Sequence, residues 1–190
     1  MRCFVAVALP ATVRERLGAA RDELRRRAPD ADVRWVSTEG LHITLKFLGE
    51  VAEDRLVEVE RALSGVAGRH PALPLAARGL GAFPTARIAR VIWAGVVDGA
   101  SLAALAGDVE AALSTLGYAP EARAFRPHVT LGRVRSRRGL GPLANALAGV
   151  ADTPFGEWTA HDVVLYRSHL RPTGAVYEAL AHAHLTGADA

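Results

Sequence analysis

The sequence predicts an α+β fold in which two lobes face each other across a cleft. The first observation is a repeated segment: residues 41–45 read Leu-His-Ile-Thr-Leu, and residues 127–131 read Pro-His-Val-Thr-Leu. The second is that each segment has a helical pattern before it and another after it, with strand patterns in between. The two halves of the chain therefore form a pseudo-repeat, not an array of short repeats.

The first half alternates between strand and helix patterns. An apolar run that stops at Pro10 indicates a buried strand. A stripe of apolar residues then indicates a helix, which Thr12 can cap and Pro29 ends. The expected elements are a strand over residues 2–9, a helix over 12–28, a short extended segment over 33–36, a turn at 37–40, the first repeat strand and a helix over about 53–67.

The second half follows the same logic. Gly117 ends its long helix, and Pro127 marks the start of the second repeat strand because proline cannot donate to a sheet ladder. The expected elements are strands over residues 73–79 and 88–97, a loop over 81–87 between them, a helix over 101–116, the second repeat strand, a basic loop over 134–142, a short helix to about 148, and two strands over 162–168 and 175–185. The loop over 81–87 combines glycine, proline, phenylalanine and arginine, which favours a segment that closes over a ligand, although glycine and proline also simply make turns.

Strand geometry places the polar residues of each repeat on one face. Side chains alternate with a period of two, so His42 and Thr44 point the same way, as do His128 and Thr130. If the two strands lie side by side, two imidazoles and two hydroxyls line one cleft, which suits a phosphate. Lys46 has the same parity as His42, whereas Arg133 has the opposite parity to His128 and reaches the site only if the strand bends near Gly132.

Two imidazoles on opposite sides of one phosphorus suit an in-line displacement. One must be neutral to take a proton from water, and the other protonated to give a proton to the leaving oxygen. The ordinary histidine pKa near 6.5 lets one pair hold both states near neutrality. The hydroxyls of Thr44 and Thr130, with Lys46 or Arg133, would hydrogen-bond the non-bridging oxygens. This chemistry needs no metal ion and no cofactor.

Composition places the chain among globular proteins with a polyanionic partner. Its 190 residues, half of them hydrophobic and 23% charged, suit one domain over residues 1–190 with two interleaved lobes. A formal charge of +3 and an isoelectric point near 9.6, carried almost wholly by arginine, favour a phosphate-rich partner. The single Cys3 and the lack of a membrane-length apolar run predict a cytoplasmic protein with no membrane contact. We expect a monomer without an obligate protein partner.

Other chemistries fit less well. A serine or cysteine nucleophile lacks its elbow motif, and no glycine-rich nucleotide loop is present. His182 and His184 share a strand face and would hold a metal with His161 or His169, but a solvated strand face is the preferred interpretation because carboxylates are scarce nearby.

Several segments carry a resemblance to a known family. They are residues 41–49 and 125–131 around the two histidines, with 4–7, 81–84, 90–93 and 165–168. They resemble the two-histidine phosphoesterase superfamily, and within it the bacterial and archaeal RNA 2′,3′-cyclic phosphodiesterases, also called 2′-5′ RNA ligases. The resemblance spans almost the whole chain.

The resemblance implies a bilobal, pseudo-symmetric fold with antiparallel sheets flanking a central cleft and helices outside. It implies hydrolysis of RNA 2′,3′-cyclic phosphates to 2′-phosphomonoesters, with reversible 2′-5′ ligation as an accompanying reaction. It also implies that His42 is the proton donor and His128 the proton acceptor, with Thr44 and Thr130 holding the phosphate. The further substrate contacts that we expect are Arg126, Arg133, Lys46, Phe83, Arg90 and Tyr166.

Two alternatives remain open at this stage. One is a related two-histidine enzyme that acts on another cyclic or 2′-5′-linked nucleotide. The other is a non-catalytic RNA-binding module that uses the basic surface, which predicts salt-sensitive binding that survives loss of both histidines.

Overall fold

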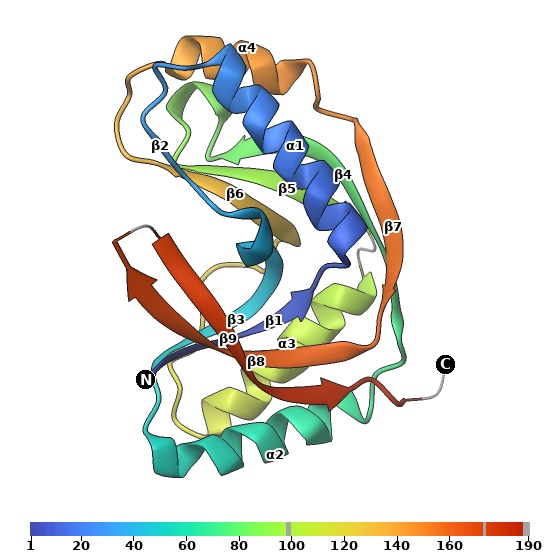
Figure 1. The fold of residues 1–190 in the computed structure, drawn as a ribbon. Helices are drawn as coiled ribbons and strands as arrows, with labels where there is room; N and C mark the ends of the chain where they lie inside the picture. Colours follow the sequence, from blue (N-terminus) through green and yellow to red (C-terminus); the bar gives the residue numbers. More distant parts are fainter. Residues whose placement is uncertain (98–99, 173, 188–190) are drawn as a thin grey trace.

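The structure is a computed structural model that describes residues 1–97, 100–172 and 174–187 (Figure 1). Its strands are β1 (Arg2–Ala8), β2 (Val33–Trp35), β3 (His42–Glu50), β4 (Leu73–Phe83), β5 (Val91–Val97), β6 (His128–Val134), β7 (Pro154–Ala160), β8 (Asp162–Arg171) and β9 (Gly174–His184). Its helices are α1 (Ala11–Arg27), α2 (Leu56–Ala67), α3 (Ala100–Thr115) and α4 (Leu140–Ala148), with short 3-10 turns η1 (Thr38–Gly40), η2 (Glu53–Arg55) and η3 (Ala86–Ile88). None of the described helices is long and apolar enough to cross a membrane.

The strands form one curled antiparallel sheet with the order β7-β4-β5-β6-β3-β1-β8-β9, and β2 pairs with β6 beside this path. Helices α1 and α4 pack against each other and against one half of the sheet, whereas α2 and α3 pack together against the other half (Figure 1). The two halves meet where β3 pairs with β6 through Ile43 and Val129. The predicted α+β class with antiparallel halves and outer helices is confirmed.

Register shows that the two halves repeat each other. The pairs Phe4–Phe47, Ala6–Thr44 and Ala8–His42 between β1 and β3 match the pairs Val91–Arg133, Trp93–Thr130 and Gly95–His128 between β5 and β6. Each repeat strand also has one extra residue at the same place, Leu45 in β3 and Leu131 in β6, where the register shifts. A bulge of this kind reverses the faces of the residues that follow it.

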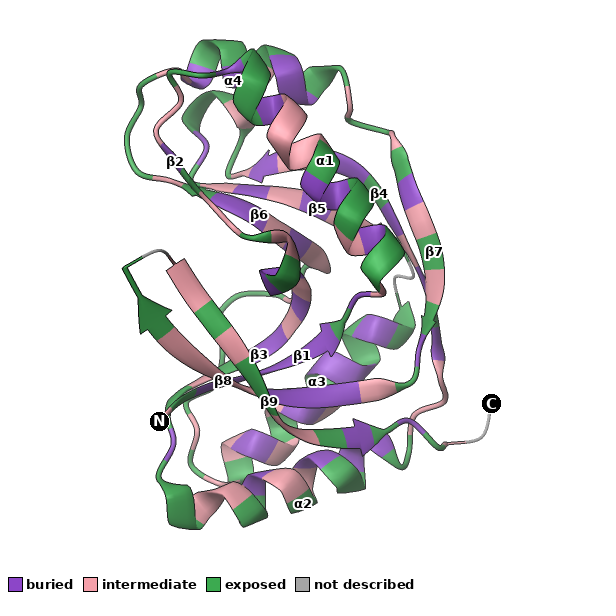
Figure 2. Cartoon of the chain, viewed as in Figure 1, coloured by how far each residue is buried: buried purple, intermediate pink, exposed green. Residues whose placement is uncertain are grey.

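The apolar side of each repeat strand lies in the core, as its alternation predicts. Ile43, Val129 and Leu131 are fully buried, and Leu45 nearly so. Figure 2 shows β1 buried along almost its whole length. At the usual coefficient of about 25 cal/mol per Å², each such aliphatic side chain contributes about 1.5–3 kcal/mol. The core thus fixes the strand faces, and with them the direction in which the histidines point.

Some predicted elements differ in the structure. Helix α1 begins at Ala11 with Pro10 as its N-cap, so the predicted Thr12 cap is wrong. Pro10 suits this place because the φ that its ring fixes is compatible with the extended backbone of an N-cap residue. The basic loop predicted over 134–142 is shorter, since α4 begins at Leu140 and accommodates Pro142 in its first turn.

The region between residues 73 and 97 also differs. Strand β4 continues to Phe83, so the predicted loop over 81–87 is reduced to a turn that contains η3, and Ile88 belongs to that turn. Gly81 lies inside the strand. A side chain does not fit at this position, because the Trp93 ring lies 2.4 Å from where its Cβ would be. Strand β7 was not predicted at all. Gly156, with φ of 135°, interrupts its alternation.

Candidate active site

His42 begins β3 directly after η1, and two hydrogen bonds hold its ring. Its Nδ1 lies 2.8 Å from the carbonyl oxygen of Gly40, and its Nε2 lies 3.0 Å from Oγ1 of Thr44. A carbonyl only accepts, so Nδ1 carries the proton and donates it. In the neutral ring Nε2 is therefore the basic nitrogen, and the Thr44 hydroxyl donates to it.

His128 begins β6 in the same way. Its Nδ1 donates to the carbonyl oxygen of Arg126, which is 2.7 Å away and also two residues earlier. Both rings therefore have the same tautomer, with Nε2 as the basic nitrogen. The pairs β1–β3 and β5–β6 have matching registers, so the fold places the two histidines in equivalent positions.

The two histidines act on each other electrostatically, since the charge of His128 lowers the pKa of His42. The Arg133 guanidinium lowers the pKa of both rings, so all three groups face the same region. Thr44 and Thr130 lie on the same faces as their histidines, as the strand alternation predicts. The four expected catalytic side chains therefore come from two neighbouring strands.

Burial is the main influence on the charge state of both rings. It lowers the pKa of His42 to about 4, against the bond to Gly40, which favours the charged form. Burial also lowers the pKa of His128. Near pH 7 the unliganded site therefore holds two neutral imidazoles, and a bound anion is needed to protonate one of them.

Aromatic rings surround His42. The ring centroids of Phe4, Tyr177 and Tyr166 lie 4.7, 5.1 and 6.3 Å from that of His42, and Tyr177 meets it edge-on. Sequence reasoning missed Phe4 and Tyr177. The period-two alternation of β1 and β9 predicts only which face of its strand each side chain takes. The curl of the sheet brings β9 to the turn before His42, and the alternation does not predict that curl.

His128 has a different neighbour in the equivalent place. The Phe83 ring meets it edge-on at 5.3 Å, and the Arg126 guanidinium lies 5.7 Å above the Phe83 ring. Phe83 pairs with Val91 as Tyr166 pairs with Phe4, so these two predicted contacts occupy matching positions in the two halves. Arg90 is exposed, and its main chain bonds to those of Phe83 and Val134.

The bulges decide the positions of Arg133 and Lys46. Arg133 pairs with Val91, two residues from the Trp93 that pairs with Thr130, so the bend near Gly132 brings it onto the face of the site. The equivalent bulge at Leu45 of β3 turns Lys46 the other way. Its buried Nζ donates to Glu110 at 2.7 Å and to the Ala119 carbonyl at 2.8 Å, so the predicted position beside His42 is wrong.

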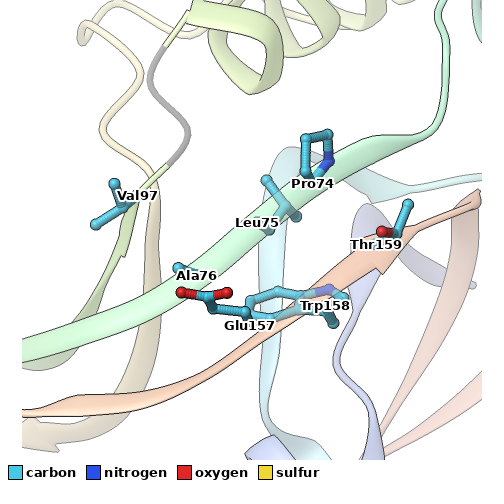
Figure 3. Close-up of a pocket in the computed structure, with 7 residues that line it drawn as sticks. All are labelled: Pro74, Leu75, Ala76, Val97, Glu157, Trp158 and Thr159. Atoms are coloured by element: carbon cyan, nitrogen blue, oxygen red, sulfur yellow. The ribbon is translucent and has the colours of Figure 1, made fainter.

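Two other places are not acid–base sites. A pocket of about 380 Å³ lies over β4, β5 and β7, where Glu157 is the one titratable group among apolar residues and Thr159 (Figure 3). Of the four histidines weighed as metal ligands, His184 bonds to Asp162 and His169 to Glu178. Within the described residues, no group of three or more His, Cys, Asp or Glu side chains is arranged to hold a metal ion.

Comparison with known proteins decides the family. The model of the LigT-like phosphoesterase family matches residues 7–93 and 96–177, one histidine repeat in each segment. This chain belongs to that family. It is thus an enzyme of the phosphodiesterase class, and the recognition drawn from its sequence is confirmed.

Relatives and solved structures agree with this assignment. The chain is 33% identical to an RNA 2′,3′-cyclic phosphodiesterase of Methanothermobacter thermautotrophicus, over 93% of this chain and 95% of that protein. It is 36% identical to one of Archaeoglobus fulgidus, over 95% and 98%. A Thermus thermophilus crystal structure matches with a TM-score of 0.80 and 31% identity over 98% and 99% of the two chains. E. coli LigT in complex with 3′-AMP matches with a TM-score of 0.71 and 29% identity over 97% and 98%.

Proposed function

We propose that this LigT-like phosphoesterase hydrolyses RNA 2′,3′-cyclic phosphate ends to 2′-phosphomonoesters without a metal ion. The observation that carries the proposal is the pair of imidazoles that are each anchored through Nδ1 and present Nε2 on one face of the sheet. The activity of the named relatives agrees with it. A cytoplasmic, monomeric protein remains part of this proposal, consistent with its single buried Cys3.

The reaction is one in-line displacement. Nε2 of His128 accepts a proton from water as the water oxygen forms a bond to phosphorus. The bond from phosphorus to the 3′ oxygen breaks, and Nε2 of His42 donates a proton to that oxygen, which leaves the phosphate on the 2′ oxygen. If an RNA 5′ hydroxyl replaces water, the same steps form a 2′-5′ linkage.

The remaining groups stabilise charge on the phosphate. In this proposal Thr44, Thr130 and Arg133 hydrogen-bond the non-bridging oxygens, where negative charge grows in the transition state. The low pKa of His42 fits this scheme only with substrate bound, because the phosphodiester anion raises the pKa of a nearby imidazole. Binding would thereby charge the acid at the moment it is needed.

The test is hydrolysis of a nucleoside 2′,3′-cyclic phosphate in excess EDTA, with the product isomer identified. We expect a 2′-phosphate, and a loss of about 10²–10⁴-fold in kcat for His42→Ala or His128→Ala while the fold is kept. A 3′-phosphate product would contradict the assigned leaving oxygen. Activity lost in EDTA would contradict metal independence, and RNA binding without turnover would support the binding-module alternative.

The two histidine roles need a separate experiment. A cyclic substrate with sulfur in place of the 3′ oxygen releases a thiolate, which needs less help from a general acid. The loss caused by His42→Ala should therefore shrink on the thio substrate, while the loss caused by His128→Ala stays the same. Rescue of His128→Ala instead would reverse the two roles.

A further inference from the structure

Strands β8 and β9 extend as a hairpin arm on the side of the molecule where β2 lies (Figure 1). On one face of this arm Tyr177 lies opposite Ser168, and Ala175 lies opposite Leu170, whose side chain is 70% exposed. A Cβ added at Gly40, in the turn that leads to His42, would lie 3.4 Å from Cε2 of Tyr177. The arm therefore reaches from the His42 turn outward to an exposed tip.

Three arginines from three other strands act electrostatically on the same tyrosine. Burial raises the pKa of the Tyr177 hydroxyl, and the positive charges of Arg133, Arg34 and Arg2 oppose that effect. Arg34 of β2 pairs directly with Arg133 of β6, so both side chains lie on one face. This basic cluster, Arg2, Arg34 and Arg133, continues outward from the catalytic histidines.

Within the described residues the cluster has no carboxylate partner. Some other arginines do pair with acids, as Arg78 does with Asp152 and Arg135 with Asp32. Within residues 1–97, 100–172 and 174–187, none of the three clustered guanidinium groups forms an ion pair with an acid. The arm's Glu178 lies on the opposite face, where it bonds to His169. Guanidinium groups without a carboxylate suit phosphate oxygens.

We propose that the basic cluster and the β8–β9 arm bind the RNA strand that precedes the cyclic phosphate. This inference rests on the proposed function and adds to it the path that the RNA strand takes over the protein surface. A cyclic phosphate ends the RNA at its 3′ side, so the rest of the strand leaves from the 5′ oxygen of the terminal ribose. Arg34 and Arg2 meet the next backbone phosphates, and Leu170 at the tip offers apolar contact to a base.

The experiment compares a 2′,3′-cyclic mononucleotide with a cyclic-phosphate-ended tetranucleotide that carries the same terminal nucleotide. The wild type should have a higher kcat/KM on the tetranucleotide. Arg34→Gln should lower that value by about three- to tenfold and change the mononucleotide value less than twofold. Its log–log salt dependence on the tetranucleotide should become shallower by about 0.7, the amount for one phosphate contact in a single strand.

The matched control is Arg61→Gln, which removes the same charge from the exposed side of α2. This control should leave kcat/KM unchanged on both substrates. Equal kcat/KM values for Arg34→Gln and Arg61→Gln on the tetranucleotide would overturn the proposed RNA path. Equal kcat/KM values of the wild type on the two substrates would overturn it as well. A wild type that fails on both substrates would instead refute the proposed function, so the two failures are distinguishable.

Discussion

One hydrogen bond from Nδ1 fixes the tautomer of each histidine. The Gly40 and Arg126 carbonyls accept the Nδ1 proton, so Nε2 is the basic nitrogen of each neutral ring. Burial lowers the pKa of both rings, and in the proposed mechanism a bound anion raises that of His42 again.

That burial has a consequence for stability. The folded pKa of His42 is about 4 and the unfolded value is about 6.5, so between these values the unfolded state binds more protons. The contribution of His42 is therefore fully present above pH 6.5 and is lost as the pH falls toward 4. From pH 7 to pH 4 the wild type should lose about 3 kcal/mol more free energy of unfolding than His42→Gln, measured by urea unfolding. Parallel pH profiles for the two proteins would contradict the burial argument.

At the scale of the element, one extra leucine in each repeat strand decides which face the following residues take. In β6 it returns Arg133 to the site, and in β3 it sends Lys46 toward Glu110 of α3. The equivalent of Lys46 in β6 is Gly132, where a Cβ would lie 2.7 Å from the Val33 side chain, so β2 packs there instead. Equivalent bulges in β3 and β6 are thus followed by residues that pack against different neighbours.

Lys46→Met tests the structural role of that lysine. The substitution removes the charged donor from the Glu110 carboxylate, which keeps Ser114 and Glu121 as donors, and the side-chain donor from the Ala119 carbonyl, which should cost about 1–3 kcal/mol in free energy of unfolding. The kcat of the folded enzyme should stay unchanged. Combining the variant with Glu110→Gln should recover part of the loss as a coupling energy. A large fall in kcat without a change in stability would return Lys46 to the site.

At the scale of the whole molecule, two halves with one register meet at Ile43 and Val129 and present their active faces together. The family match in two segments follows the same division. The symmetry is broken around the histidines, because β9 adds Tyr177 beside His42, while the Arg126 guanidinium lies over the Phe83 ring that meets His128 edge-on. This difference gives the two sides of the candidate site distinct surroundings.

Equivalent positions predict equivalent threonine roles. Thr44→Val and Thr130→Val should each lose about 2–4 kcal/mol of transition-state stabilisation, measured as kcat/KM on a cyclic mononucleotide. Thr115→Val, at the exposed end of α3, is the control and should keep full activity. An unchanged kcat/KM in either repeat variant would remove that hydroxyl from the mechanism.

The local sequence determined what depends on neighbours along the chain. The alternation of apolar Ile43 and Val129 with the polar residues around them set the strand faces, and with them the shared face of the two histidines and two threonines of the candidate site. Only the tertiary structure decided what depends on pairing across strands. The bulges that separate Lys46 from Arg133 are set by β1 and β5, and the curl that brings Tyr177 to His42 is set by the whole sheet. Period-two reasoning assumes a regular strand and cannot see either effect, because each arises from a partner that is distant in sequence.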